Sequence, residues 1–133
     1  MRTLVLVAVT TVALFAADDT VFVGNPRVRF DADGKTTSPH ELSGEGAEKY
    51  ACRITKSGRK YIWASRENRE LIRSEAGDFT YFISPEGTGY VKIFTGKAGG
   101  KRDGNFDYME QLTSDLKTFT YWGKTSHQLA ATK

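Results

Sequence analysis

Residues 50–65 read YACRITKSGRKYIWAS and decide the fold of the chain. Apolar and polar residues alternate on both sides of Ser57-Gly58, where glycine supplies the positive φ of a two-residue hairpin turn. The predicted pairs are Lys56 with Arg59, Ile54 with Tyr61, Cys52 with Trp63, and Tyr50 with Ser65. Side chains alternate faces along a strand, so one face of this hairpin is apolar and faces the core. That face carries Tyr50, Cys52, Ile54, Tyr61 and Trp63.

The chain contains a single cysteine, Cys52, and so forms no internal disulfide. The predicted pairing places Cys52 against Trp63 on the core face, where a free cysteine behaves as a small hydrophobic residue. We therefore expect a buried thiol and not a nucleophile.

A second hairpin is predicted at 79–94, FTYFISPEGTGYVKIF. The stretch Pro85-Glu86-Gly87-Thr88 is typical of a turn and pairs Phe79 with Phe94, Phe82 with Val91, and Ile83 with Tyr90. Both faces of this hairpin are apolar, which places it in the middle of the sheet.

Two interpretations fit 106–116. As a hairpin with a turn at 113–115, the segment pairs Leu112 with Leu116, Tyr108 with Thr120, and Phe106 with Trp122. As a helix, it places Phe106, Met109, Leu112 and Leu116 on one face. We favour the hairpin. The stretch 118–122 is strand-like in both interpretations.

The remaining segments are less regular. Short strands are predicted at 20–23 and 28–31, separated by Gly24-Asn25-Pro26, with a further short strand at 70–74. The polar stretch 35–49 is predicted as a loop with a turn of helix near 39–42. The glycine-rich, basic stretch 95–105 is predicted as an exposed loop.

The first residues have the order of a secretory signal peptide: Arg2, an uncharged apolar run from Thr3 to Phe15, and Ala16-Ala17. The predicted organisation is a signal peptide at 1–17, a single β-rich domain at 18–123 and a disordered tail at 124–133. We expect a secreted or periplasmic protein without a transmembrane anchor after cleavage. The fold class is all-β (or β-rich α+β), an antiparallel sheet of about six to eight strands curling into a barrel or sandwich.

The sequence lacks the residue patterns of common catalytic and metal-binding sites. The two histidines, His40 and His127, lie in polar segments and have no ligand spacing with Cys52. The loop at 95–102 departs from a phosphate-binding loop, which needs glycine at Thr95 and serine or threonine at Arg102. We predict no catalytic residue, no metal and no cofactor, and we favour a protein that is not an enzyme.

Charge is concentrated in one region, although the formal net charge is only +3. Residues 53–73 carry seven basic side chains against Glu67 and Glu70. This pattern predicts a binding module for an anionic glycan, an envelope surface or an acidic protein; export does not favour nucleic acid. Two alternatives stay open, a small carboxylate-dependent hydrolase and a structural cell-envelope component. The candidate ligand-binding residues are Arg53, Lys60, Arg66, Arg69, Arg73, Lys97, Lys101 and Arg102.

Overall fold

The computed structural model describes residues 19–102 and 104–127. The predicted signal peptide and the residues after 127 lie outside this range. The described residues form the following elements: β1 (Asp19–Ala32), β2 (Thr37–Glu41), α2 (Gly44–Lys49), β3 (Cys52–Ser57), β4 (Lys60–Trp63), β5 (Arg69–Ala76), β6 (Phe79–Ile83), β7 (Gly89–Phe94), β8 (Tyr108–Ser114) and β9 (Lys117–His127).

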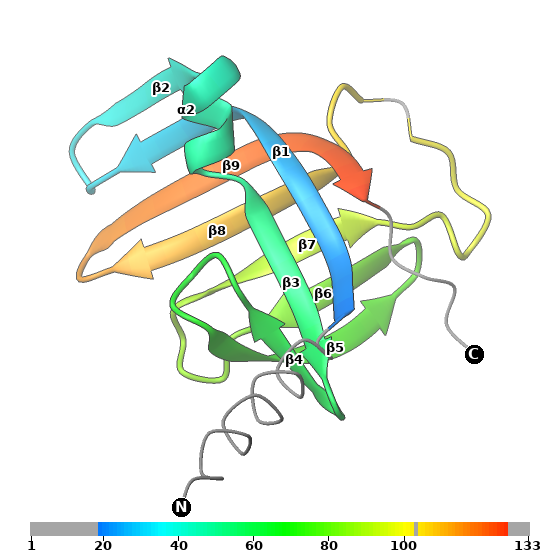
Figure 1. Ribbon diagram of the computed structural model, residues 1–133. Coiled ribbons are helices and arrows are strands. Elements are labelled where there is room, and N and C mark those ends of the chain that lie inside the picture. The colour runs from blue at the N-terminus through cyan, green and yellow to red at the C-terminus, as the bar shows by residue number, and fades with distance from the viewer. Residues whose placement is uncertain (1–18, 103, 128–133) are drawn as a thin grey trace, which may run out of the picture.

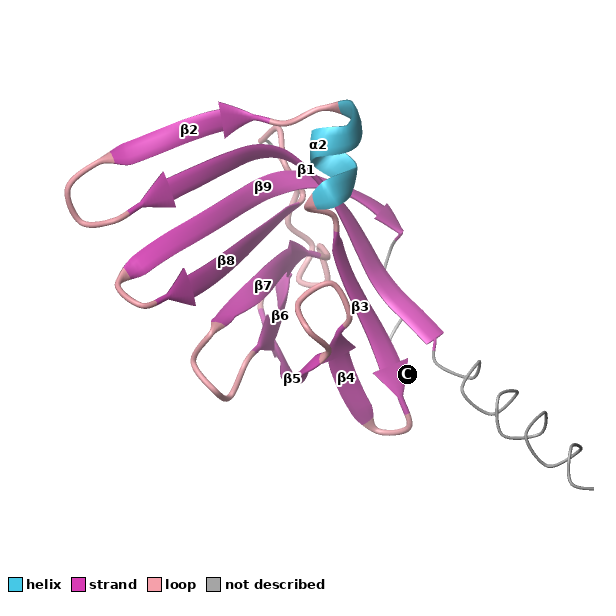
Figure 2. Cartoon of the chain, turned by 60° about the vertical axis from the view of Figure 1, so that its left-hand side comes forward, coloured by secondary structure: helices cyan, strands magenta, loops and turns pink. Residues whose placement is uncertain are grey.

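The strands form an eight-stranded antiparallel barrel with one extra strand (Figure 1). Neighbours follow the order β1-β3-β4-β5-β6-β7-β8-β9, and the pairing of β1 with β9 closes the cylinder. The extra strand β2 pairs only with the C-terminal half of β1, and α2 lies against β1 (Figure 2). The predicted all-β class and the barrel form of the sheet are confirmed.

The prediction of two strands around Gly24-Asn25-Pro26 is wrong, because β1 is continuous over 14 residues. β1 pairs along one edge with β3 (residues 19–24) and along the other with β9 (residues 23–32), and register shifts beside Gly24 and Pro26 interrupt the pairing with β9. The strands approach closely at this closure. A Cβ at Gly24 would lie 2.5 Å from the ring of Tyr108, and one at Gly123 would lie 2.0 Å from the carbonyl oxygen of Asn25.

The first hairpin has the predicted faces but a different register. Gly58 and Arg59 form the turn, so Ser57 pairs with Lys60 and Ile54 pairs with Trp63. Gly58, with φ of 62°, takes the first position of the turn instead of the predicted second. The shift is two residues, and an even shift keeps the strand residues on their predicted faces. Cys52, Ile54 and Trp63 are accordingly all buried. The prediction for Tyr50 is wrong, because this residue caps the C-terminus of α2 and lies outside the main core cluster.

The second hairpin is confirmed, since Phe79 pairs with Phe94, Phe82 with Val91, and Ile83 with Tyr90. The hairpin interpretation of the last segment is also right, but its register is wrong. The turn is Asp115-Leu116, and Leu112 pairs with Phe119. This differs from the prediction by an odd number, so side chains exchange faces.

Two predicted irregular segments contain regular structure. The predicted loop at 35–49 holds β2 and α2, and β2 is exposed throughout. Pro39 lies in the middle of this edge strand, a residue that discourages pairing with another chain. The predicted tail begins too early, because pairing of β9 with β1 extends the strand to His127.

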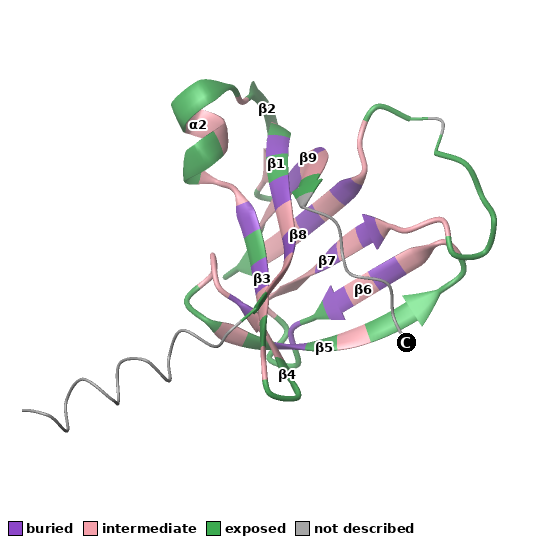
Figure 3. Ribbon diagram, turned by 45° about the vertical axis from the view of Figure 1, so that its right-hand side comes forward, coloured by how far each residue is buried: buried purple, intermediate pink, exposed green. Residues whose placement is uncertain are grey.

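Every barrel strand contributes at least one buried residue, and Figure 3 shows the buried positions along the ribbon. In a small barrel such residues fill the interior, which is therefore a packed core and not an open ligand cavity. Within the described residues, no helix is long and apolar enough to cross a membrane. The buried apolar residues of the main cluster are Phe22, Cys52, Ile54, Trp63, Leu71, Phe82, Val91, Ile93 and Tyr108.

Candidate functional site

The candidate basic residues divide between the two ends of the barrel. We call one the basic end; it holds the turns at 58–59 and 77–78 and the loop between β7 and β8. We call the other the helix end; it holds α2 and the connections at 64–68 and 84–88. Lys60, Arg73, Lys97, Lys101 and Arg102 lie at the basic end. Arg53, Arg66 and Arg69 lie at the helix end.

Arg66 belongs to the core and not to a binding surface. Its Nε and Nη2 donate to the two carboxylate oxygens of Glu110 at 2.9 and 2.7 Å, and Trp63 Nε1 donates to the same carboxylate at 2.8 Å. Glu110 is fully buried. Burial alone would lower the pKa of Arg66, but the bonds and charge of Glu110 outweigh it and raise that pKa. The group is therefore a satisfied buried ion pair.

The other two candidates at the helix end are Arg69, which forms ion pairs, and Arg53, which lies apart from the other candidates. Arg69 donates to Glu86 at 2.8 Å and to Glu67 at 2.9 Å. Arg53 is exposed on the outer face, and its backbone N–H donates to the Ser65 hydroxyl. The structure therefore does not bring Arg53, Arg66 and Arg69 together with the other candidates as one cationic surface.

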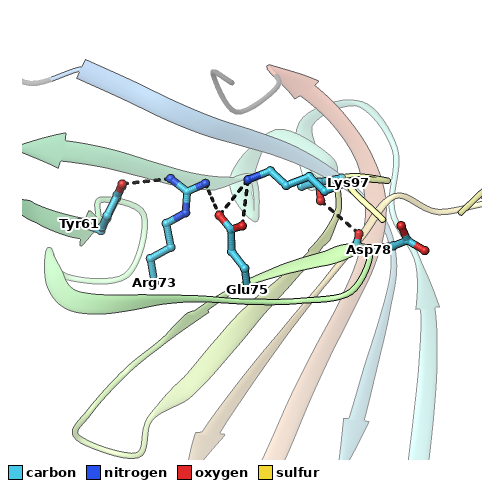
Figure 4. Close-up of polar contacts among 6 residues, drawn as sticks. Tyr61, Arg73, Glu75, Asp78 and Lys97 are labelled. Atoms are coloured by element: carbon cyan, nitrogen blue, oxygen red, sulfur yellow. Dashed lines mark hydrogen bonds and ion pairs between the residues drawn. The ribbon is translucent and has the colours of Figure 1, made fainter. Parts of the chain in front are cut away.

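A row of polar side chains crosses the basic end (Figure 4). Arg73 donates to the Tyr61 hydroxyl at 3.1 Å and to Glu75 at 2.7 Å, while Lys97 contacts both Glu75 oxygens at 2.9 Å. Lys56 Nζ lies 5.5 Å from the centre of the Tyr61 ring. Lys97, followed by Arg73, lowers the pKa of the Glu75 carboxyl. Arg73 and Lys97 therefore share Glu75, and Lys56 lies beside them on the Tyr61 ring.

Exposed cations surround the row. Arg59 and Lys101 have no carboxylate partner within the described part of the chain, and Lys60 lies 3.9 Å from Glu70. Among the described residues in the half of the barrel nearer the basic end, basic residues outnumber acidic ones. The basic ones are Lys56, Arg59, Lys60, Arg73, Lys92, Lys97, Lys101, Arg102 and Lys124, and the acidic ones are Asp19, Glu70, Glu75, Asp78 and Asp107.

The half nearer the helix end is close to balanced, with a small acidic excess. Ion pairs neutralise much of its positive charge, including Arg29 with Asp31 as well as the pairs of Arg66 and Arg69. Its basic residues are Arg27, Arg29, Lys35, Lys49, Arg53, Arg66, Arg69 and Lys117. Its acidic residues are Asp31, Asp33, Glu41, Glu45, Glu48, Glu67, Glu86, Glu110 and Asp115.

The glycine-rich loop after β7 already cradles an anion, the side chain of Asp78. The backbone N–H groups of Ala98 and Gly100 donate to one carboxylate oxygen at 2.8 and 3.0 Å. The backbone carbonyl of Asp78 also accepts from Thr95 and Gly96. Backbone N–H groups that converge in this way form an anion-binding nest. The loop is therefore fastened to the β5–β6 turn.

An aromatic groove adjoins the basic end on the outer face of the barrel. Its volume is about 220 Å³. Phe79 pairs across strands with Phe94, and their rings meet edge to face at 5.8 Å. Lys92 Nζ lies 4.3 Å from the centre of the Phe79 ring. The groove is lined by Phe79, Lys92, Phe94, Arg102, Phe106, Asp107, Tyr108, Met109 and Trp122.

Sequence reasoning missed this groove because its aromatic residues come from separate strands. The alternation of Phe79, Tyr81 and Ile83 with core residues was the available signal, since it places large apolar groups outside as well as inside. The error in the register of β8 and β9 hid the contribution of Trp122. In the structure Trp122 pairs with Met109 on the outer face.

Two carboxylates share a depression at the β1–β2 turn, lined by Asp31 and Asp33. Asp31 accepts both guanidinium bonds of Arg29. The backbone N–H groups of Thr36 and Lys35 lower the pKa of Asp33. A hydrolase of this type needs a carboxylic acid with a raised pKa, so this depression gives the hydrolase alternative no support.

Cys52 lies in the core as predicted. Burial, and then the charge of Glu110, raise the pKa of the Cys52 thiol well above its usual value. Reactive cysteines have the opposite environment. Within the described residues, no three His, Cys, Asp or Glu side chains are grouped so that they could hold a metal ion.

No protein-family model, curated protein or solved structure matches this chain.

Proposed function

We propose that this protein is an exported, non-enzymatic binding module that holds an anionic partner at the basic end of its barrel. The observation that carries the proposal is the excess of cations at this end among the described residues, where the exposed side chains of Arg59, Lys60 and Lys101 have no bidentate carboxylate partner. An anionic ligand would gain charge-assisted hydrogen bonds from these exposed cations.

The surroundings support the same location. Arg59, Lys60 and Lys101 extend the positive surface into solvent, where they steer an anion toward the barrel end. Of the residues predicted for binding, Lys60, Arg73, Lys97, Lys101 and Arg102 remain candidates. Arg66 does not, because its partner Glu110 is fully buried. Arg53 and Arg69 do not, because they lie at the helix end.

The test reverses exposed charges at each end while leaving ion pairs of the core intact. One variant carries Arg59→Glu, Lys60→Glu and Lys101→Glu. The matched control carries Arg27→Glu, Lys35→Glu and Lys117→Glu, which change net charge equally at the helix end. Binding to polyglutamate and polygalacturonate is measured between about 50 and 200 mM salt, where surface electrostatics are progressively screened.

We expect the first variant to lose binding to both polymers and the control to bind as the wild type does. Equal behaviour of the two variants would contradict the location at the basic end. Export is tested separately by mass spectrometry of secreted protein, which should begin near Ala17 or Asp18. A mature protein that retains Met1 would contradict export.

A further inference from the structure

We propose that the aromatic groove is a subsite for one sugar ring of an anionic polysaccharide, with Lys92 and Arg102 contacting its carboxylate or sulfate. This inference rests on the proposed function, because the polymer would continue from the groove onto the basic end. It adds a ligand class and a second set of contacts.

The groove combines two kinds of group that suit such a ligand. Aromatic side chains come from three strands and from the segment before β8, namely Phe79, Phe94, Trp122 and Phe106. Aromatic rings offer large contact area at low entropic cost, and ligand sites are commonly lined by them with a few placed polar groups. Lys92 and Arg102 supply the cations. A volume of about 220 Å³ suits a single ring.

The walls of the groove are held in place before any ligand arrives. The backbone of Asp107 bonds to Phe94 on β7 and to Gly123 on β9, at 2.9 and 2.8 Å. Its carboxylate accepts from the backbone N–H of Thr125. Arg102 donates to the backbone carbonyl of Phe106, and this hydrogen bond links two of the residues that line the groove. A preformed site avoids the ordering cost of binding.

The lining favours a glycan over other polyanions. A polymer of acidic residues such as polyglutamate would use Lys92 and Arg102 but has no ring to place against the aromatic side chains. Nucleic acid has both rings and anions, but it carries a phosphate at every nucleotide, and the acidic residue Asp107 is among those that line the groove. A carboxylate repels phosphate but accepts hydrogen bonds from sugar hydroxyl groups.

The experiment compares polygalacturonate, polyglutamate and oligo(dT) by isothermal titration. Phe106→Ala and Lys92→Gln should each weaken polygalacturonate binding about tenfold, the scale of one lost stacking or charged contact. Phe106→Ala should leave polyglutamate binding nearly unchanged, because polyglutamate has no ring. Tyr90→Ala is the matched control, because Tyr90 shares the strand and face of Lys92 but lies outside the groove. Urea unfolding of each variant verifies that the barrel is intact.

The outcomes separate the groove from the basic end. If reversal of Arg59, Lys60 and Lys101 abolishes binding while Phe106→Ala and Lys92→Gln have no effect, the groove inference is overturned and the proposed function stands. If that reversal has no effect, the proposed function fails. Failure of the wild type to bind polygalacturonate, or tighter binding of oligo(dT), would overturn the glycan as occupant.

Discussion

Two arginine–glutamate pairs at opposite ends of the barrel look alike locally and differ in what surrounds them. Arg66 meets Glu110 and Arg73 meets Glu75, each at 2.7 Å, and the two arginine side chains are exposed to similar extents, 16% and 17%. Glu110, however, is fully buried, whereas 38% of the Glu75 side chain is exposed. The carboxylate, and not the arginine, distinguishes the two pairs.

This difference assigns the pairs different roles. A buried carboxylate has no water to replace a lost partner, so Glu110 must keep Arg66 and Trp63. Glu75 can exchange its protein partners for water at little cost. The same residue types thus make a pair that the fold cannot lose at one end and a pair that it can lose at the other, and under the proposed function the second pair contacts the anionic ligand.

The largest effect is expected from removing the buried arginine. Arg66→Met leaves the Glu110 charge uncompensated in the core and should lower the free energy of unfolding by about 3–5 kcal/mol. Arg73→Met should lower it by about 1 kcal/mol or less. Urea unfolding measures both. Equal losses for the two variants would contradict the distinction between the pairs.

An intermediate effect is expected at Cys52, whose surroundings include Glu110. Its folded pKa is raised above the unfolded value of 9.0 by burial first. Above about pH 9 the unfolded state therefore binds fewer protons than the folded state, and stability falls as the pH rises. Cys52→Ala should flatten this decline. In addition, a thiol reagent should label the wild type in urea but not in the native state, and rapid native labelling would contradict the buried position.

The fold was predictable where turn chemistry and periodicity agree. The hairpin at 79–94 has a single plausible turn, and its register followed from it. At 50–65 the turn was misplaced, yet the faces were right because the error was even. At 106–123 the turn was placed at 113–115 instead of 115–116, and the odd error exchanged the faces of Trp122 and its neighbours. The single strand β1 was not predictable, since its continuity depends on pairing with β9, which closes the barrel.

The candidate site was predictable only as a tendency toward positive charge. Arg66 was selected because it lies among other basic residues, but its partner Glu110 is 44 residues away. Local sequence does not show such a pair. The same limit hid Glu75 as the shared partner of Arg73 and Lys97, because the loop that brings Lys97 to it is fastened by Asp78.

The smallest effect on stability is expected from Glu75→Gln. The pKa of Glu75 is lowered in the folded state, chiefly by Lys97 and then by Arg73, so its contribution is present above about pH 4.5 and is lost as the pH falls further. The variant should lack this acid-side dependence and otherwise melt near the wild type. Asp33→Asn is the control variant, because it also removes a carboxylate with a lowered pKa, but at the helix end of the barrel.

The same variant gives the sharpest functional contrast between the two ends. Glu75→Gln removes the carboxylate that competes with an anionic ligand for Arg73 and Lys97, so binding of polygalacturonate should strengthen. Asp33→Asn makes the same change in net charge and should not strengthen it to the same degree. Equal gains would show that only total charge matters. Weaker binding by Glu75→Gln would show that Glu75 positions these cations for the ligand instead of competing with it.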